Sequence, residues 1–205
     1  ALDGDGDRVI LVDSDGNILD GDDLLYIMAF SNPNRAGPWG GVVGTKMSNF
    51  GLEDGLKKLG YKFIRADVGD KYVSQKLSEK GWLLGGETSG HIISKDLVST
   101  GDGTIAALKV ISSLMILEKT PSEVLSNYNK RPQINIAVPV KNKDVINDSS
   151  IQSAISDAQS DITVDRVLVR PSGTESKIRV MVEATDENTA KKYAKDLSKL
   201  IESKL

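Results

Sequence analysis

The order of apolar and polar positions over the first two thirds of the chain alternates between short apolar runs and longer amphipathic segments. The runs Arg8–Val12 and Gly40–Met47 are typical of strands, and Asp70–Lys80 has the spacing of a helix. The longest predicted helix is Gly101–Lys119, and its apolar positions recur at helical spacing: Ile105, Leu108, Ile111 and Met115. This alternation predicts an α/β domain with a mixed, mostly parallel sheet and covering helices.

The pattern changes after the polar segment Asn129–Gln133, which contains a proline and is the best candidate for a linker. Beyond it, the sequence predicts a small α+β domain, one sheet with helices on one face. Its expected strands span 134–139, 166–169 and 177–183, and its expected helices span 149–158 and 187–205. We therefore expect three parts: residues 1–20, the end of a preceding domain, residues 21–130, the α/β domain, and residues 131–205, the C-terminal domain.

The composition of the chain excludes several classes of function and of site. The 205 residues carry 26 Lys and Arg against 29 Asp and Glu, and the net charge of −3 argues against non-specific binding to nucleic acid. The absence of cysteine excludes disulfides and thiolate metal sites and is compatible with a reducing cytosol, so we expect a cytoplasmic protein. No segment approaches the roughly 18 apolar residues of a membrane span. Only Ala1 and Leu2 precede the first polar loop, which predicts a fragment whose upstream part is missing; natural processing is the alternative.

The first loop with candidate chemistry is DGDGDR, in which Asp3, Asp5 and Asp7 alternate with glycines. In extended backbone, residues two apart point to one face, so the three carboxylates would present oxygens to one point. Hard oxygen ligands select Mg²⁺ or Ca²⁺, and three protein ligands leave positions open for a phosphate oxygen. An EF-hand is excluded, because its sixth and twelfth positions would be Arg8 and Ser14. A solvated acidic turn is the alternative.

The second loop is GGETSGHI, residues 85–92. Its glycines allow a ligand to approach the backbone closely, and Glu87 and Ser89 offer groups suited to sugar hydroxyls. His91 is the only histidine of the chain, and an imidazole suits proton transfer. The alternative is a tight turn with a capping serine and a hydrogen-bonded histidine. Lys71, at the start of a predicted helix, is a weaker candidate for a phosphate or sugar contact.

The third loop is RPSGTESKIR, residues 170–179. Hydroxyls and backbone N–H groups that can form an anion-binding nest come from Ser172, Gly173 and Thr174. Arg170 can hold a phosphate through two hydrogen bonds, and Arg179 is a second cationic arm. A hairpin turn with an exposed arginine is the alternative, and a Walker A loop is excluded because its motif occurs nowhere in the chain.

A cation loop, a sugar loop and a phosphate loop together indicate a phosphorylated sugar as the ligand. The chain resembles the α-D-phosphohexomutases, whose metal, sugar and phosphate loops are similar to DGDGDR, GGETSGH and RPSGTESKIRVMVEA in the same order. The stretch DGDGDRVILVDSDGNILDGDDLLYIMA is most similar to family members that act on an amino sugar phosphate. The resemblance covers essentially the whole chain and implies the end of the second domain, the third domain and the fourth domain of a four-domain enzyme.

The resemblance implies a role for each loop. Asp3, Asp5 and Asp7 would bind Mg²⁺, Arg8 would lie beside a phosphoserine, and His91 would transfer a proton. Sugar hydroxyls would be bound by Glu87 and Ser89, and the non-reacting phosphate by Arg170, Ser172, Gly173, Thr174 and Arg179. Two positions depart from the family: Thr88, where glutamine is frequent, and Ser176, where proline is usual.

The implied activity is the interconversion of the 6-phosphate and 1-phosphate of a hexosamine through a phosphoserine and a sugar bisphosphate. The serine loop of the family, TASHNP or similar, is absent from this sequence, so we expect the chain alone to be inactive and to need a missing N-terminal half. Assembly as a homodimer stays open. The alternatives are a relative acting on mannose or glucose phosphates and a non-catalytic module that binds Mg²⁺, Ca²⁺ or a phosphosugar.

Overall fold

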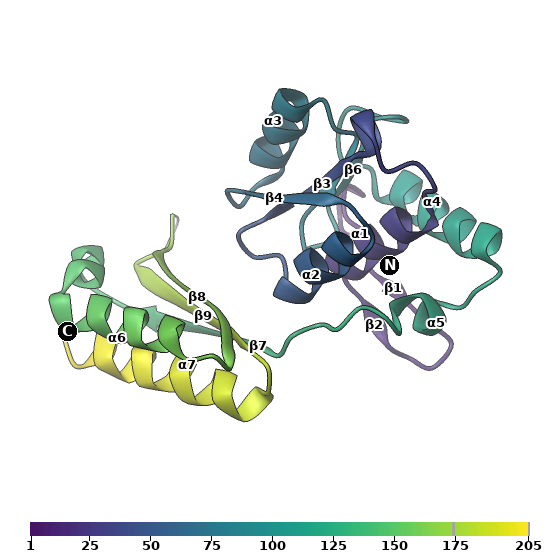
Figure 1. Cartoon of the computed structure of the whole chain (residues 1–205). Helices are drawn as coiled ribbons and strands as arrows, with labels where there is room; N and C mark the ends of the chain where they lie inside the picture. The colour runs from purple at the N-terminus through teal and green to yellow at the C-terminus, as the bar shows by residue number, and fades with distance from the viewer. Residues whose placement is uncertain (174, 205) are drawn as a thin grey trace. The chain divides into compact units, whose positions relative to one another are not determined.

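The chain folds into two compact units, residues 1–130 and residues 131–205. The computed structural model describes residues 1–173 and 175–204, and Figure 1 shows the elements of both units. The boundary falls between Lys130 and Arg131, inside the polar segment 129–133. Lys130 is fixed to the first unit, because its Nζ lies 2.7 Å from Asp20 Oδ2 and 2.8 Å from Asp23 Oδ2.

The first unit is built on a four-stranded sheet with the order β4-β3-β5-β6. The central strand β3 (Gly41–Thr45) runs parallel to β4 (Lys62–Ala66) and to β5 (Leu84–Gly86). The edge strand β6 (Ile92–Ser94) is antiparallel to β5. Every residue of β3 is buried, as expected for a strand covered on both faces. The predicted mixed, mostly parallel sheet is therefore confirmed.

Five α-helices lie in the described part of the first unit: α1 (Gly21–Ser31), α2 (Phe50–Lys58), α3 (Asp70–Lys80), α4 (Gly103–Leu117) and α5 (Pro121–Leu125). A 3₁₀ turn, η1 (Gly37–Trp39), precedes β3. Helix α1 is the centre of the core, since Leu24, Leu25 and Ile27 have no solvent exposure. Its start is fixed by the Asp20 side chain, which accepts hydrogen bonds from the backbone N–H groups of Asp22 and Asp23.

The predicted strand Arg8–Val12 is only partly correct. Regular pairing is confined to a short hairpin of β1 (Leu11–Val12) and β2 (Ile18–Leu19). Upstream of it, the chain folds back, so that the Ile10 N–H donates to the Ala1 carbonyl at 3.0 Å. Because the hydrogen-bonding partner changes from residue to residue, this segment forms isolated bridges in place of one strand.

Helix α4 turns several of its large apolar side chains toward solvent. Its buried residues are small or medium-sized and include Ala106 and Val110. Leu108 is 61% exposed and Met115 is 73% exposed, although both lie on the stripe that the sequence spacing selects. The helical spacing is confirmed, but the core of the first unit is covered by the opposite side of the helix.

The second unit is an antiparallel three-stranded sheet with the order β7-β9-β8. Its strands are β7 (Gln133–Pro139), β8 (Val164–Pro171) and β9 (Lys177–Ala184), and its helices are α6 (Ser149–Ser160), α7 (Glu187–Glu202) and the 3₁₀ turn η2 (Lys143–Asn147). Helix α6 packs on β8, while α7 packs on β7 and β9 (Figure 1). The fully buried side chains of Ile151, Ile178 and Ile201 form the centre of this core, and the predicted small α+β domain is confirmed.

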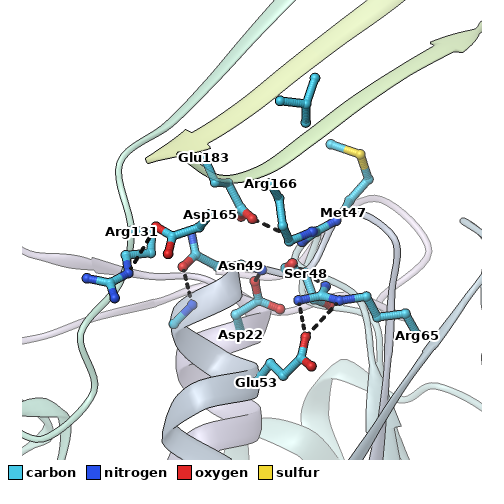
Figure 2. A network of polar contacts seen from close by, with 12 residues as sticks. Asp22, Met47, Ser48, Asn49, Glu53, Arg65, Arg131, Asp165, Arg166 and Glu183 are labelled. Atoms are coloured by element: carbon cyan, nitrogen blue, oxygen red, sulfur yellow. Dashed lines mark hydrogen bonds and ion pairs between the residues drawn. The ribbon is translucent and has the colours of Figure 1, made fainter. Parts of the chain in front are cut away.

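Each unit contains a partly buried arginine that is paired with a carboxylate (Figure 2). In the first unit, Arg65 Nη2 lies 3.0 Å from Glu53 Oε2, and the same guanidinium donates to the backbone carbonyls of Thr45 and Ser48. In the second unit, Arg166 Nη1 lies 3.0 Å from Glu183 Oε2. Each pair compensates a guanidinium that folding largely removes from water, and the second also compensates the fully buried carboxylate of Glu183. Among the residues that the structure describes, no helix combines the length and the apolar character that crossing a bilayer requires.

The two sides of α4 predict opposite responses to truncation. Val110→Ala removes two buried methyl groups and leaves a cavity, so it should lower the free energy of unfolding by about 2 kcal/mol. Met115→Ala on the exposed side should change it by less than about 0.5 kcal/mol. Urea denaturation of this chain measures both values, and equal losses would contradict the observed orientation of the helix.

Candidate functional site

The three aspartates of the DGDGDR loop converge on one point. Each of Asp3, Asp5 and Asp7 offers a carboxylate oxygen, and these oxygens lie within 4.8 Å of one another. Asp3 and Asp5 are exposed and Asp7 is half-buried, so the group is open on one side. An all-oxygen donor set of this kind fits Mg²⁺ or Ca²⁺ and leaves coordination positions for other ligands.

Arg8 balances part of this negative charge. Its Nε lies 3.7 Å from Asp3 Oδ2 and 3.9 Å from Asp7 Oδ1, and its backbone N–H donates to Asp3 Oδ1 at 3.2 Å. Desolvation acts to raise the pKa of Asp3, but the hydrogen bonds that it accepts and the charge of Arg8 hold that pKa below its usual value. Arg8 itself is exposed, so its guanidinium is accessible to a second anion.

Backbone contacts join the acidic loop to the GGETSGHI loop and to the start of α4. The Val9 N–H donates to the Gly90 carbonyl at 3.1 Å, and Arg8 and His91 form an antiparallel bridge. Gly90 has a φ of +91°, and a Cβ there would collide with the Val9 carbonyl, so only glycine permits this approach. The Gly103 N–H, in the first turn of α4, donates to the Gly6 carbonyl at 2.9 Å. Three segments that are distant in sequence thus form one site in the first unit.

His91 lies inside this site and contacts a predicted metal ligand. Its Nδ1 is 3.0 Å from Asp7 Oδ2, and the residue is only 4% exposed. Among the described residues, its Nε2 has no hydrogen-bond partner. The structure therefore places this histidine beside Asp7, with its ring turned away from solvent.

The other predicted sugar-binding residues belong to the same region of the first unit. Glu87 Oε1 accepts a hydrogen bond of 2.9 Å from the N–H of Gly69, just before α3. Lys71 lies in the first turn of that helix, and its side chain is exposed. Ser89 lines a cavity of about 290 Å³ together with Asp3 and Arg8. The sugar loop and the acidic loop therefore share one opening.

Asp22 is a buried carboxylate behind the sugar loop that the sequence motifs did not predict. It is fully buried at the start of α1, and its Oδ2 accepts hydrogen bonds from the Thr88 hydroxyl at 3.1 Å and the Asn49 N–H at 2.8 Å. Burial raises its pKa to about 6, although the Asn49 N–H acts in the opposite direction. Thr88 thus points into the protein and anchors the sugar loop. The signal in the sequence was the acidic segment DGDD at residues 20–23, which is typical of ordinary helix capping.

The predicted phosphate loop lies in the second unit, at the turn between β8 and β9. Arg170 and Arg179 stand directly opposite each other on these strands. Within the described residues, Arg170 Nε is buried without a hydrogen-bond partner. Ser172 is buried, whereas a Cβ at Gly173 would meet nothing within 4 Å. Thr174, which the sequence also predicts for this loop, lies outside the described residues.

Two lysines near this loop were not predicted from the sequence. Lys143 Nζ donates to the Ser172 carbonyl at 2.6 Å, and Lys177 Nζ lies 2.7 Å from Glu175 Oε1. Hydrogen bonding from Lys177, with the charges of Lys177 and Arg179, holds the pKa of Glu175 below its usual value. One carboxylate in this turn is therefore surrounded by several cations, so the turn has a local excess of positive charge.

Comparison with protein families identifies the two units of the chain. Residues 20–131 match the model described as phosphoglucomutase/phosphomannomutase, alpha/beta/alpha domain III. Residues 134–200 match the C-terminal domain of the same enzymes. The chain belongs to the phosphoglucomutase/phosphomannomutase family. It corresponds to domain III and the C-terminal domain of that family, together with the acidic loop that precedes domain III.

Curated relatives of this family are similar over nearly the whole chain. A phosphoglucosamine mutase of Cellvibrio japonicus is 47% identical over 207 residues, which cover 100% of this chain and 46% of the relative. A phosphoglucosamine mutase of Teredinibacter turnerae is 45% identical and covers 98% of this chain and 46% of the relative. The chain thus spans about half the length of the curated relatives that it matches.

Solved structures of the family have the same fold. The Aspergillus fumigatus N-acetylphosphoglucosamine mutase, in complex with GlcNAc-6P and magnesium, aligns with a TM-score of 0.80. The match covers 98% of this chain and 51% of that chain, with 21% sequence identity. At this identity the comparison establishes the shared fold.

The buried carboxylate of Asp22 predicts a pH-dependent stability. Because its folded pKa of about 6 exceeds the 3.8 of an aspartate in water, the folded state binds a proton more tightly, and this group's contribution to stability rises as pH falls through 6. Between pH 7.5 and pH 5, the wild-type chain should gain about 1 kcal/mol of unfolding free energy relative to Asp22→Asn. Urea denaturation at both pH values measures the difference, and parallel pH profiles would contradict the assigned burial.

Proposed function

We propose that the chain is the cation- and substrate-binding part of a cytoplasmic phosphoglucosamine mutase. Together with the preceding domains of such an enzyme, it would interconvert glucosamine 6-phosphate and glucosamine 1-phosphate through a phosphoserine and a bisphosphate intermediate. The observation that carries the proposal is the joining of the acidic loop to the Glu87–His91 loop, which puts a cation site and a sugar site at one opening. The similarity to curated phosphoglucosamine mutases supports the choice of substrate.

The acidic loop would hold the cation of this enzyme. Asp3, Asp5 and Asp7 would supply three oxygens, and Mg²⁺ is the cation we propose because hard oxygen ligands suit it. When bound, Mg²⁺ stabilises negative charge on a phosphoryl oxygen. Arg8, beside the same carboxylates and exposed to solvent, would contact the phosphoryl group that is transferred.

The sugar would be held by Ser89, which lines this opening, together with Glu87 and Lys71. Glu87 accepts from a backbone N–H through one oxygen, which fixes the carboxylate for contact with sugar hydroxyls. Ser89 would donate to or accept from a neighbouring hydroxyl, and Lys71 on α3 would contact a phosphate or a sugar oxygen.

The turn between β8 and β9 would hold the phosphate that is not reacting. Like charges directly opposite on neighbouring strands destabilise a sheet, so the pair Arg170 and Arg179 favours a bound anion. The buried Nε of Arg170, unpartnered within the described residues, would donate to a phosphate oxygen. Ser172, Gly173 and Thr174 would add hydroxyl and backbone N–H donors.

The phosphate loop gives a direct binding test. Arg170→Ala should weaken the binding of glucosamine 6-phosphate by tenfold or more, because a hydrogen bond to a charged group contributes about 1.5–3 kcal/mol. Lys191→Ala, on α7 and paired with Glu187, is the matched control for loss of one positive charge and should bind as the wild-type chain does. Isothermal titration calorimetry measures both, and unchanged affinity of Arg170→Ala would remove this arginine from the site.

The absence of the donor serine predicts the activity of the chain itself. Without the donor serine, these 205 residues should show no mutase turnover with glucosamine 6-phosphate. A longer enzyme of the same sequence should prefer glucosamine phosphates over mannose and glucose phosphates. A coupled assay over this substrate panel tests both statements. Turnover by the chain alone would refute the proposed role, and a preference for mannose or glucose phosphate would refute the proposed substrate.

A further inference from the structure

The carboxylate of Asp22 is a buried titratable group to which the proposed function gives no role. Its Oδ2 accepts hydrogen bonds from the Asn49 N–H at 2.8 Å and from the Thr88 hydroxyl at 3.1 Å, and Figure 2 shows Asp22 beside Asn49. Within the described residues, its Oδ1 has no hydrogen-bond partner. A single oxygen therefore connects the start of α1 to two other segments of the first unit.

These two segments follow neighbouring parallel strands. Asn49 belongs to the segment between β3 and α2, and Thr88 belongs to the turn between β5 and β6. Because β3 and β5 are paired and parallel, the segments that follow them begin at the same edge of the sheet. The carboxyl edge of the strands is where open α/β sheets bind their ligands. The Asp22 carboxylate therefore holds two loops together at the edge of the sheet that carries the sugar loop.

The backbone of α1 contacts the same turn. The Gly21 N–H donates to the Thr88 carbonyl at 3.0 Å. A Cβ at Gly21 would collide with the Glu87 carbonyl, so the helix approaches the turn this closely only with glycine at its first position. The turn is closed by a hydrogen bond of 3.0 Å from the Gly90 N–H to the Glu87 carbonyl. One backbone hydrogen bond and one side-chain hydrogen bond thus hold the turn against α1.

The anchored residue lies between the two proposed sugar ligands of the loop. The hydroxyl of Thr88 points to the buried Asp22. Glu87 Oε1 instead accepts from the Gly69 N–H before α3, and Ser89 lines the cavity of about 290 Å³. Because Thr88 is bonded to both neighbours, a rotation of its backbone away from α1 would displace Glu87 and Ser89 together. The placement of both ligands therefore depends on the contacts of the residue between them.

We propose that Asp22 is a positioning residue that holds the sugar loop in its binding conformation through the hydroxyl of Thr88. This inference rests on the proposed sugar site at Glu87 and Ser89. A loop that adopts its binding conformation for only part of the time binds its ligand more weakly in proportion to that fraction. Burial raises the pKa of Asp22 to about 6, so at pH 8 the carboxylate is ionised and its hydrogen bond with Thr88 is charge-assisted. Breaking this bond should weaken sugar binding although no group that touches the sugar is removed.

Two variants of Thr88 separate positioning from packing. Thr88→Val keeps the shape of the side chain but removes the hydroxyl, and it should weaken the binding of glucosamine 6-phosphate at pH 8 by about tenfold. Thr88→Ser restores a hydroxyl and should bind within a few-fold of the wild-type chain. The matched control is Ser113→Ala, which removes a hydroxyl hydrogen bond between α4 and Ser31 of α1 and should leave the affinity unchanged. Isothermal titration calorimetry measures the affinities, and urea denaturation verifies that each variant is folded.

Variants of Asp22 test the same hydrogen bond from its acceptor side. Asp22→Asn keeps an oxygen that can accept from Thr88 and should retain most of the affinity, whereas Asp22→Leu has no acceptor and should weaken binding as Thr88→Val does. Because both changes break one hydrogen bond, the double variant of Asp22→Leu with Thr88→Val should bind no more weakly than Thr88→Val alone. Additive losses of affinity would contradict the proposed coupling.

Glu87→Ala separates failure of this inference from failure of the proposed sugar site. If Glu87→Ala weakens the binding of glucosamine 6-phosphate while Thr88→Val binds as the wild-type chain does, Asp22 does not position the loop, although the sugar site stands. If Glu87→Ala also binds normally, the loop is not the sugar site and both proposals fail. Equal weakening by Thr88→Val and Thr88→Ser would overturn the inference as well, because the hydroxyl would then have no part in the effect.

Discussion

The hydrogen bond from the Val9 N–H to the Gly90 carbonyl is the contact on which the candidate site of the first unit depends. It brings the acidic loop and the sugar loop together across most of the first unit's sequence. The approach is so close that any side chain at position 90 would collide with the backbone of Val9. This backbone contact therefore determines where the carboxylates of the acidic loop and the imidazole of His91 lie relative to each other.

Buried polar side chains connect the loops of the candidate site to the core of the first unit. Asp22 connects the start of α1 to Thr88 in the sugar loop and to Asn49 before α2, and His91 connects the sugar loop to Asp7. Burying such groups is costly unless they are hydrogen-bonded, so each one restricts the conformations open to the loop that it anchors. The hydroxyl of Thr88 donates to the buried Asp22, so this side chain anchors the sugar loop inside the protein.

In the second unit, positive charges gather at the turn between β8 and β9. Its sheet places Arg170 opposite Arg179, and Lys143 adds a third cation at the carbonyl of Ser172. Glu175 offsets part of this charge through its contacts with Lys177 and Arg179. A bound anion would reduce the repulsion between these cations and so stabilise the turn. The predicted phosphate loop is thus consistent with the electrostatics of its own unit.

The sequence by itself determined the fold class, the three loops and most of the elements, because periodicity and short motifs depend on neighbouring residues. It also indicated that Asp3, Asp5 and Asp7 point to one place, although they converge because residues 4–7 form a bend with Gly6 at a φ of +73°, and not because the backbone is extended. Only the tertiary structure decided which side of α4 is buried. Apolar residues lie on both sides of this helix, so their spacing does not show whether Leu108 and Met115 or Ala106 and Val110 face the core. It also decided that His91 contacts Asp7 and that Asp22 holds Thr88, since these contacts join residues brought together by sheet pairing and burial.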